Sequence, residues 1–264
     1  MIGAIIGDIV GSRFEWHNIK TKEFALFTPR CRPTDDSVMT LAVAQAILDS
    51  AEDPDSLARN AVRRMQELGR RYPRAGYGGR FRSWLHAEDP QPYNSYGNGS
   101  AMRVSPCGFA ANSLEEAIAM ADAVTAVTHN HPEGMKGAEA TAAAIFLARS
   151  GKSKEEIRAH IVRHYYPLDF TLDEIRPTYS FDVSCQGSVP QALEAFFEST
   201  DFEDAIRSAI SIGGDSDTIA AITGGVAEAY YGVPAPIRIM ALAFLDDTQR
   251  GIFERFEERA QDPD

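Results

Sequence analysis

The sequence predicts an all-α protein, and two observations lead to that prediction. Apolar residues recur at helical spacing, most clearly in segment 201–212, where they stand at i, i+3, i+4, i+7 and i+8: Phe202, Ala205, Ile206, Ala209 and Ile210. The chain also lacks alternating runs of β-branched residues joined by hairpin turns, so a sheet-based domain is not expected.

Similar helical patterns recur along the whole chain. In order, they cover residues 37–49, 56–70, 114–127, 134–149, 154–163, 190–198, 201–212, 218–230, 235–245 and 248–260. Alanine is abundant between 114 and 149, which favours helix formation and close helix packing. Near the start, Gly7 and Gly11 stand four residues apart and would give a helix one smooth face.

Two long stretches, about 72–108 and 165–188, carry no clear helical pattern. They are rich in glycine, proline and serine, but they also contain aromatic residues such as Trp84 and Phe181, which flexible linkers lack. Irregular segments of this length in a compact protein tend to be functional. We therefore expect ordered loops that build a binding cleft, within a single domain over residues 1–264.

Composition narrows the possible functions. The formal net charge of −12 argues against sequence-independent binding to nucleic acid or to an anionic membrane, because nothing would neutralise the phosphates. No apolar run approaches the roughly 20 residues that span a bilayer. Three scattered cysteines predict no disulfide framework. The apolar N-terminal segment 1–11 contains Asp8 and has no basic residues at its start, so we do not expect a signal peptide. We expect a cytoplasmic location.

Two short acidic motifs are the most informative feature of the chain. Thr34-Asp35-Asp36-Ser37 and Asp215-Ser216-Asp217-Thr218 each place two carboxylates and hydroxyl groups where a helix is predicted to begin. Capping alone explains one acid at a helix start, but both motifs supply two. A glycine pair, Gly213-Gly214, precedes the second motif and permits an unusual backbone path. Because oxygen ligands suit Mg²⁺, Mn²⁺ or Ca²⁺, the two motifs together predict a dinuclear metal site.

Three further segments contain candidate functional residues. Asp8 is expected to serve only as a local cap or a hydrogen-bond acceptor, whereas Glu15 precedes Trp16 in an apolar setting that raises carboxyl pKa values. The loop Tyr96 to Arg103 is rich in glycine and presents backbone N–H groups of the kind that bind phosphate, although by itself its composition favours an ordinary turn. In His129-Asn130-His131-Pro132, one histidine is expected to contact a ligand and the other to be structural.

Taken together, the motifs resemble the ADP-ribosylglycohydrolase family. The resemblance rests on five motifs in family order: Gly7-Asp8…Gly11…Glu15, Thr34-Asp35-Asp36-Ser37, Gly97-Asn98-Gly99-Ser100-Ala101-Met102-Arg103, His129-Asn130-His131-Pro132 and Gly213-Gly214-Asp215-Ser216-Asp217-Thr218. It implies a compact all-α bundle with a dinuclear Mg²⁺ or Mn²⁺ site in a loop-lined cleft. It also implies hydrolysis of the bond between ADP-ribose and an acceptor, a protein side chain or another ADP-ribosylated molecule.

Carried over to this chain, the resemblance implies a role for each matching residue. The metal ligands would be Thr34, Asp35, Asp36, Asp215, Asp217 and Thr218, with Asp217 bridging two ions. The ADP-ribose contacts would be Gly97, Asn98, Gly99, Ser100 and His131. The catalytic carboxylates would be Glu15 and Asp36, either of which would align the attacking water, with Glu15 as general acid, general base or gate. The loops 75–81 and 179–186 match no family motif and are expected to select the acceptor.

Two other functions remain open at this point. Paired aspartate clusters alone would also suit a dinuclear metallohydrolase that acts on a phosphate ester. A protein that binds ADP-ribose without cleaving it would retain the same fold, although here every expected metal ligand is present.

Overall fold

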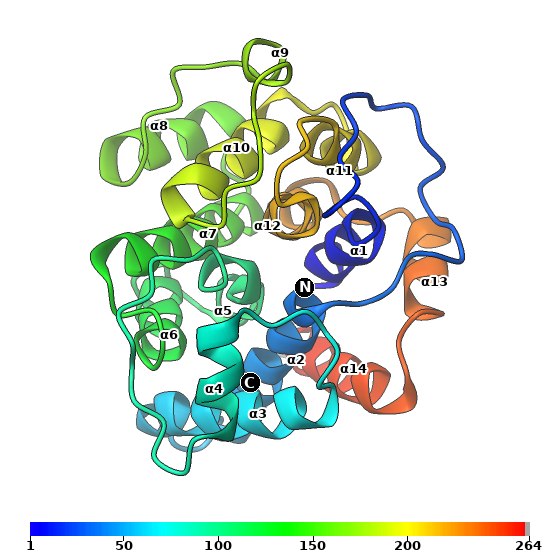
Figure 1. Ribbon diagram of the computed structural model, residues 1–264. Coiled ribbons are helices and arrows are strands. Elements are labelled where there is room, and N and C mark those ends of the chain that lie inside the picture. Colours follow the sequence, from blue (N-terminus) through cyan, green and yellow to red (C-terminus); the bar gives the residue numbers. More distant parts are fainter. Residues whose placement is uncertain (262–264) are drawn as a thin grey trace.

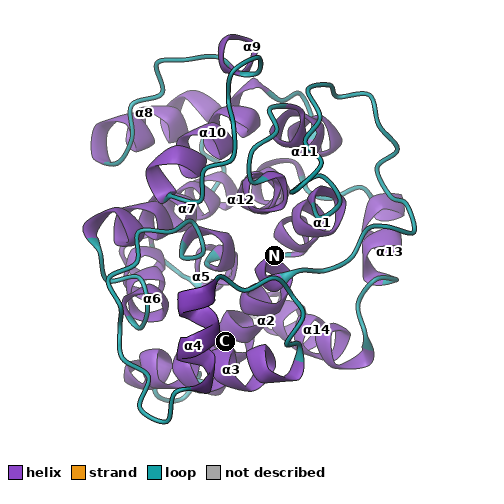
Figure 2. Cartoon of the chain, in the orientation of Figure 1, coloured by secondary structure: helices purple, strands orange, loops and turns teal. Residues whose placement is uncertain are grey.

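The computed structural model describes residues 1–261, and these residues contain helices and no β-strand (Figure 1, Figure 2). The predicted all-α class is thereby confirmed. The α-helices are α1 (Ile2–Gly11), α2 (Asp35–Asp49), α3 (Leu57–Arg71), α4 (Gly79–His86), α5 (Ser105–Ala110), α6 (Leu114–Ala126), α7 (Pro132–Arg149), α8 (Lys154–His164), α9 (Leu172–Ile175), α10 (Cys185–Glu198), α11 (Phe202–Ser211), α12 (Ser216–Tyr231), α13 (Ala235–Leu242) and α14 (Asp247–Gln261). Two 3₁₀ helices, η1 (Pro54–Ser56) and η2 (Ala101–Arg103), complete the described elements.

Helix α12 lies at the centre of the molecule, with α1, α7, α10 and α11 packed around it (Figure 1). It is buried from Ser216 through Ala227, and α1 is buried along its whole length. The two helices pack through glycines: a Cβ atom on Gly7 would lie 2.0 Å from the carbonyl oxygen of Ala220. The smooth face predicted from Gly7 and Gly11 is therefore the α1–α12 interface.

Helix α2 forms the second half of the core and packs against α3, α5 and α14 (Figure 1). It also contacts α1, so that α1 lies between the two helices that carry the acidic motifs. The starts of α2 and α12 both lie near the C-terminal end of α1, because Asp8 and Gly11 contact Thr34 and Asp217 respectively. This arrangement positions the candidate site.

The predicted irregular stretches contain helices that the sequence pattern did not indicate. Helix α4 and the first four residues of α5 lie within 72–108, and α9 and the first turn of α10 lie within 165–188. Helix α4 is only eight residues long, yet it buries Phe81, Trp84 and Leu85 at helical spacing. The flanking glycines and prolines hide so short a pattern, because they are typical of loops.

Within residues 1–261 no helix is both long enough and apolar enough to cross a membrane. The three cysteines, Cys31, Cys107 and Cys185, are buried and unpaired. The predicted single domain extends to residue 264, and its last three residues lie outside the described part of the chain.

Candidate metal centre and cleft

The first acidic motif begins α2. Thr34 is the N-cap residue, and its hydroxyl oxygen accepts a hydrogen bond from the backbone N–H of Asp36. Thr34 and Ser37 also donate to the carboxylate of Asp8 on α1, with both their backbone N–H groups and their hydroxyls. Asp8 is thus the hydrogen-bond acceptor that the sequence suggested, but it caps the neighbouring helix α2 rather than its own.

The second motif follows a sharp backbone turn. Gly213 and Gly214 have φ values of +73° and +76°, a left-handed conformation that favours glycine. Asn18, in the loop between α1 and α2, fixes this turn: its amide oxygen accepts from the N–H of Gly214 at 2.8 Å and its amide nitrogen donates to the carbonyl of Gly214 at 2.8 Å. The turn directs Asp215 and Asp217 toward α2, and it places the loop that carries Glu15 beside them.

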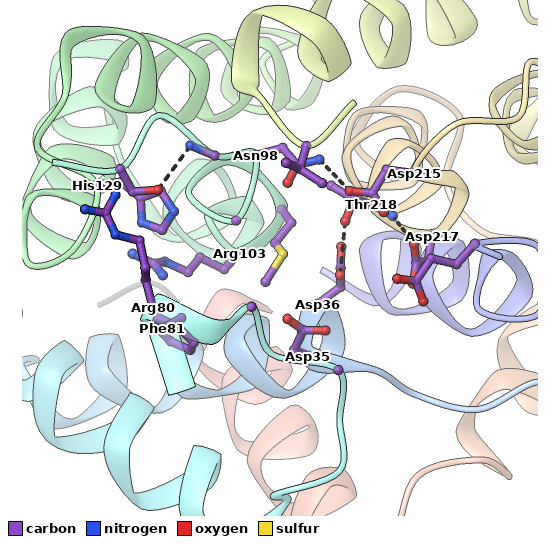
Figure 3. Close-up of a pocket in the computed structure, with 18 of the residues that line it drawn as sticks. Asp35, Asp36, Arg80, Phe81, Asn98, Arg103, His129, Asp215, Asp217 and Thr218 are labelled. Carbon is purple, nitrogen blue, oxygen red and sulfur yellow. Dashed lines mark hydrogen bonds between the residues drawn. The ribbon is translucent and has the colours of Figure 1, made fainter. Parts of the chain in front are cut away.

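The tertiary structure brings the two motifs together. One carboxylate oxygen each from Asp8, Asp36 and Asp217 lie within 4.8 Å of one another, and so do those of Glu15, Asp215 and Asp217. The hydroxyl of Thr218 donates to Oδ2 of Asp36 at 3.2 Å and links the two motifs directly (Figure 3).

Little positive charge balances this cluster: the charge of Arg32 only partly offsets the rise in the pKa of Glu15. Within residues 1–261 no lysine, arginine or histidine forms an ion pair with these carboxylates, and the buried Oδ1 atom of Asp36 has no hydrogen-bond partner. A buried, uncompensated cluster of carboxylates is costly unless a cation binds it. Because the ligand atoms are all oxygens, they fit hard divalent ions such as Mg²⁺ or Mn²⁺.

The pKa values of these groups reflect the same crowding. Burial, followed by the charges of neighbouring aspartates, raises the pKa of Asp36 and of Asp217 well above its usual range. Burial and the charge of Asp8 raise the pKa of Asp35 to about 7. Burial and the charge of Asp215 raise the pKa of Glu15 to about 7. Without a counter-ion the cluster therefore retains protons.

The six expected metal ligands do not all face the same space. Asp35, Asp36, Asp215, Asp217 and Thr218 line a cleft of about 430 Å³. Thr34 does not line it, since its side chain is buried and its hydroxyl donates to Asp8. Thr34 therefore supports the start of α2 in the described structure, and its place among the ligands stays a prediction.

The glycine loop forms another wall of the cleft. Gly97, Asn98 and Gly99 line it, and the amide nitrogen of Asn98 donates to Oδ2 of Asp215 at 2.7 Å (Figure 3). The loop is fixed to the start of α10 by two backbone hydrogen bonds, from Asn98 to Val183 and from Cys185 to Tyr96. Ser100 lies behind this wall, fully buried, where its hydroxyl donates to the carbonyl of Gly134.

The two histidines of the fourth motif have different surroundings. His129 lines the cleft. His131 does not; it is the N-cap residue of α7 and accepts a hydrogen bond from the N–H of Glu133 at 3.1 Å. One histidine was expected to face a ligand and the other to be structural. In this structure His129 faces the cleft and His131 is the structural one, because α7 begins at Pro132 and His131 caps it.

Two exposed aromatic side chains stand at the mouth of the cleft. Trp16 and Phe181 stack with ring centroids 5.1 Å apart, and their side chains are 71% and 41% exposed. Both line the cleft, and Trp16 is adjacent in sequence to Glu15. Both residues were noted in the sequence, but their meeting was not predicted, since nothing in the pattern shows that loops so far apart lie together.

Comparisons with known proteins agree with this geometry. A family model for ADP-ribosylglycohydrolase matches residues 1–261. The human protein "ADP-ribosylhydrolase ARH3" is 26% identical over 88% of this chain and 84% of its own length. "ADP-ribosylarginine hydrolase Tri1" of Pseudomonas putida is 28% identical over 99% of this chain and 78% of its own.

A solved structure supports the fold. A chain described as "ADP-ribosylglycohydrolase-related protein complex" superposes with a TM-score of 0.65 at 24% identity, covering 92% of this chain and 94% of that one. The resemblance inferred from the five sequence motifs is confirmed, because one family model spans nearly the whole chain. This protein belongs to the ADP-ribosylglycohydrolase family and is an ADP-ribosyl hydrolase.

Proposed function

We propose that this protein is a Mg²⁺-dependent hydrolase that cleaves the glycosidic bond between ADP-ribose and an acceptor, and so reverses ADP-ribosylation. The observation that carries the proposal is the buried carboxylate cluster at one side of a cleft of about 430 Å³, with Glu15 beside it. The volume lies within the range of small-molecule sites. The names of the relatives ARH3 and Tri1 favour the same class of bond.

Two divalent cations, Mg²⁺ or Mn²⁺, would be held by Asp35, Asp36, Asp215, Asp217 and Thr218, with Thr34 supporting the first motif from behind. When bound, such ions supply Lewis-acid stabilisation and orient the hydroxyl groups of a sugar. Burial of the ligands excludes water from their far side and keeps their positions fixed.

The chain's own residues would carry out the remaining chemistry. Glu15 is half-buried at the cleft and close to Asp215 and Asp217, so it would exchange a proton with the attacking water or with the departing acceptor. Asp36 would align the water, since it lines the cleft together with Glu15 and Asp217. Nearby carboxylates would stabilise positive charge that develops at the anomeric carbon.

The acceptor would leave past Trp16 and Phe181, which lie at the mouth beside Glu15. Stacked, exposed aromatic rings offer a flat apolar surface, and they favour planar or cationic groups over small aliphatic ones. The loop 179–186 therefore keeps its proposed role in acceptor selection. The three buried, unpaired cysteines favour a reducing compartment, and we retain the cytoplasm as the proposed location.

The test is hydrolysis of ADP-ribosylated peptides, with free ADP-ribose measured in Mg²⁺ and in EDTA. Asp217→Ala should abolish turnover, whereas Asp55→Ala, at an exposed position of η1, should retain it. Turnover that persists in Asp217→Ala would rule out the metal scheme. Phosphate release from simple phosphate esters without cleavage of ADP-ribosylated peptides would favour the phosphoesterase alternative, and tight ADP-ribose binding without turnover would favour a non-catalytic binder.

A further inference from the structure

The segment between α1 and α2, residues 12–34, carries Glu15 and contains no helix. It leaves the end of α1 and passes beside α11 (Figure 1). Its middle part is attached to α11, where the guanidinium group of Arg207 donates to the carbonyls of Lys22 and Phe24. The part that carries Glu15 lies before these contacts and depends on others.

Asn18 connects that part of the segment to the turn before α12. Its amide nitrogen donates to the carbonyl of Phe14 at 2.7 Å and lies 3.1 Å from the carbonyl oxygen of Glu15. The same nitrogen donates to the carbonyl of Gly214 at 2.8 Å, and the amide oxygen accepts from the N–H of Gly214 at 2.8 Å. An amide nitrogen carries two protons, so one proton fixes the segment at Phe14 and the other fixes the turn at Gly214.

Both ends of this connection lie next to a carboxylate of the cleft. Phe14 immediately precedes Glu15, and Gly214 immediately precedes Asp215. Within residues 1–261, no hydrogen bond or ion pair joins residues 14–17 to any residue outside 11–18. The hydrogen bonds of Asn18 to Gly214 are therefore what couples the backbone of Glu15 to the second acidic motif.

Lys20 is a second anchor, two residues further along. Its ammonium group donates to the carbonyl of Tyr179 at 2.6 Å and to the carbonyl of Ile212, just after α11. A Cβ atom added to Gly213 would lie 3.1 Å from Oδ1 of Asn18 and 3.1 Å from Nζ of Lys20. The glycine turn thus fits closely against both side chains.

The side chains of these two anchors differ from core residues in what their loss would do. Asn18 and Lys20 are exposed, and each binds backbone groups rather than filling the core. Removing a few exposed hydrogen bonds costs much less global stability than opening a core cavity. The effect of a substitution should therefore be concentrated in the local order of residues 12–20.

We propose that Asn18 is a positioning residue that holds Glu15 in a fixed place beside the second acidic motif, with Lys20 as a second anchor. A gate would have to leave the cleft, and leaving breaks the bonds between Asn18 and Gly214. The attachment therefore favours proton exchange over gating as the role of Glu15. The catalytic role of Glu15 rests on the proposed function, whereas the attachment of its segment does not.

Amide hydrogen exchange tests the attachment without any need for activity. Asn18→Ala should speed exchange in residues 12–20 about tenfold, because the bonds that hold this backbone are lost, and should leave α7 unchanged. The N–H groups of Phe14 and His17 report on the segment, since each donates to a nearby carbonyl. Lys20→Met should give a smaller increase, and no increase would remove Lys20 as an anchor.

Asn60→Ala is the matched control. Asn60 lies on α3, does not line the cleft and donates from its amide nitrogen to the hydroxyls of Ser50 and Ser56. It is buried, so its loss should destabilise the fold at least as much as Asn18→Ala. Exchange in residues 12–20 and kcat should nevertheless match those of the wild type.

A double-mutant cycle then tests whether Asn18 acts through Glu15. With ADP-ribosylated peptide in saturating Mg²⁺, Asn18→Ala should lower kcat about ten- to hundredfold and change KM little, because the catalytic carboxylate is misplaced. In a Glu15→Gln background the same substitution should change kcat less than about twofold, since the group that it positions has already been removed.

Unchanged exchange in residues 12–20 of Asn18→Ala would overturn the attachment. Faster exchange with a wild-type kcat, or with equal fold losses of kcat in the wild-type and Glu15→Gln backgrounds, would overturn the positioning of Glu15. A wild type that does not cleave ADP-ribosylated peptides would instead remove the proposed function and the catalytic role of Glu15. The exchange result would still decide whether Asn18 holds the segment.

Discussion

Gly11 lies directly against the backbone of Asp217: a Cβ atom on Gly11 would come within 2.5 Å of the Cα atom of Asp217. The missing side chain lets α1 touch the first turn of α12. Asp8, one turn earlier on α1, then binds the start of α2. The position of one glycine therefore controls how closely the two acidic motifs approach each other.

Gly11→Ala is expected to separate α1 from α12. Overpacking of this kind costs about 1–3 kcal/mol, and the displaced Asp217 should reduce the stabilisation that Mg²⁺ provides. Thermal unfolding with Mg²⁺ and with EDTA measures both effects. Gly251→Ala on α14 is the control, because its Cβ has room and alanine favours a helix. A Gly11→Ala variant with wild-type stability and a normal Mg²⁺ response would contradict the role given to this contact.

Asp36→Asn is expected to change stability in opposite directions with and without metal. In EDTA at neutral pH the substitution removes the cost of keeping this buried carboxyl group protonated, and it should stabilise the fold by about 1–3 kcal/mol. Mg²⁺ at a hundredfold excess over its Kd should stabilise the wild type by about 2.7 kcal/mol, and its unfolding temperature should rise accordingly. The same Mg²⁺ concentration should have little effect on the variant. A variant that is less stable than the wild type in EDTA would show that the carboxylates do not repel each other.

Glu15→Gln tests the catalytic carboxylate separately from binding. The amide keeps the size of the side chain but carries no exchangeable acid proton, so kcat should fall about 10²- to 10⁴-fold. The Kd for ADP-ribose in Mg²⁺ should change little, since the carboxylate cluster that would hold the metal remains. Steady-state kinetics and calorimetry give the two values. Near-wild-type kcat would assign Glu15 to gating or to structure.

Phe181→Ala tests the aromatic pair at the cleft mouth. Loss of one stacked ring should raise KM for an ADP-ribosylated peptide about tenfold, in keeping with the 0.5–1.5 kcal/mol of an aromatic pair, without changing the Kd for free ADP-ribose. Tyr230→Ala is a matched control, since Tyr230 is an exposed aromatic residue that does not line the cleft. Equal losses for peptide and free ADP-ribose would mean that the pair does not recognise the acceptor.

A pair of carboxyl groups outside the cleft predicts a pH dependence of stability. Burial raises the pKa of Asp122 on α6 and of Glu139 on α7, and the charge of Asp122 raises the pKa of Glu139 further. The folded protein therefore keeps protons that the unfolded chain releases above about pH 4, so stability falls as pH rises through the raised pKa values.

In excess Mg²⁺, the unfolding temperature of the wild type should fall between about pH 5 and about pH 8 by more than that of Glu139→Gln. Parallel pH profiles for the two proteins would show that the pair does not hold a proton in this range.

Helices with a long apolar face were predictable because their pattern is local. The face of α11, with Ile206 and Ala209, needs no partner to be recognised. Helix α4 was missed because eight residues between glycine and proline give too little pattern, and its stability comes from burying Phe81 and Trp84 against other elements.

The candidate site was predictable only in part, for the same reason. The two acidic motifs are visible because each combines a helix start with an excess of carboxylates. His129 and His131 look alike in sequence, and only the start of α7 shows which of them becomes a cap.

The sequence by itself determined the helical fold, the family and the chemistry of the acidic motifs, because periodicity, capping residues and short motifs are properties of adjacent residues. Only the tertiary structure decided which groups share the cleft. Asp36 and Thr218 are 182 positions apart and meet through a hydrogen bond, while Ser100 turns away to cap a buried carbonyl. Contacts of this kind depend on how closely whole helices pack. At α1 and α12 that distance is set by Gly7 and Gly11, whose smooth face the sequence predicted but whose partner helix only the structure shows.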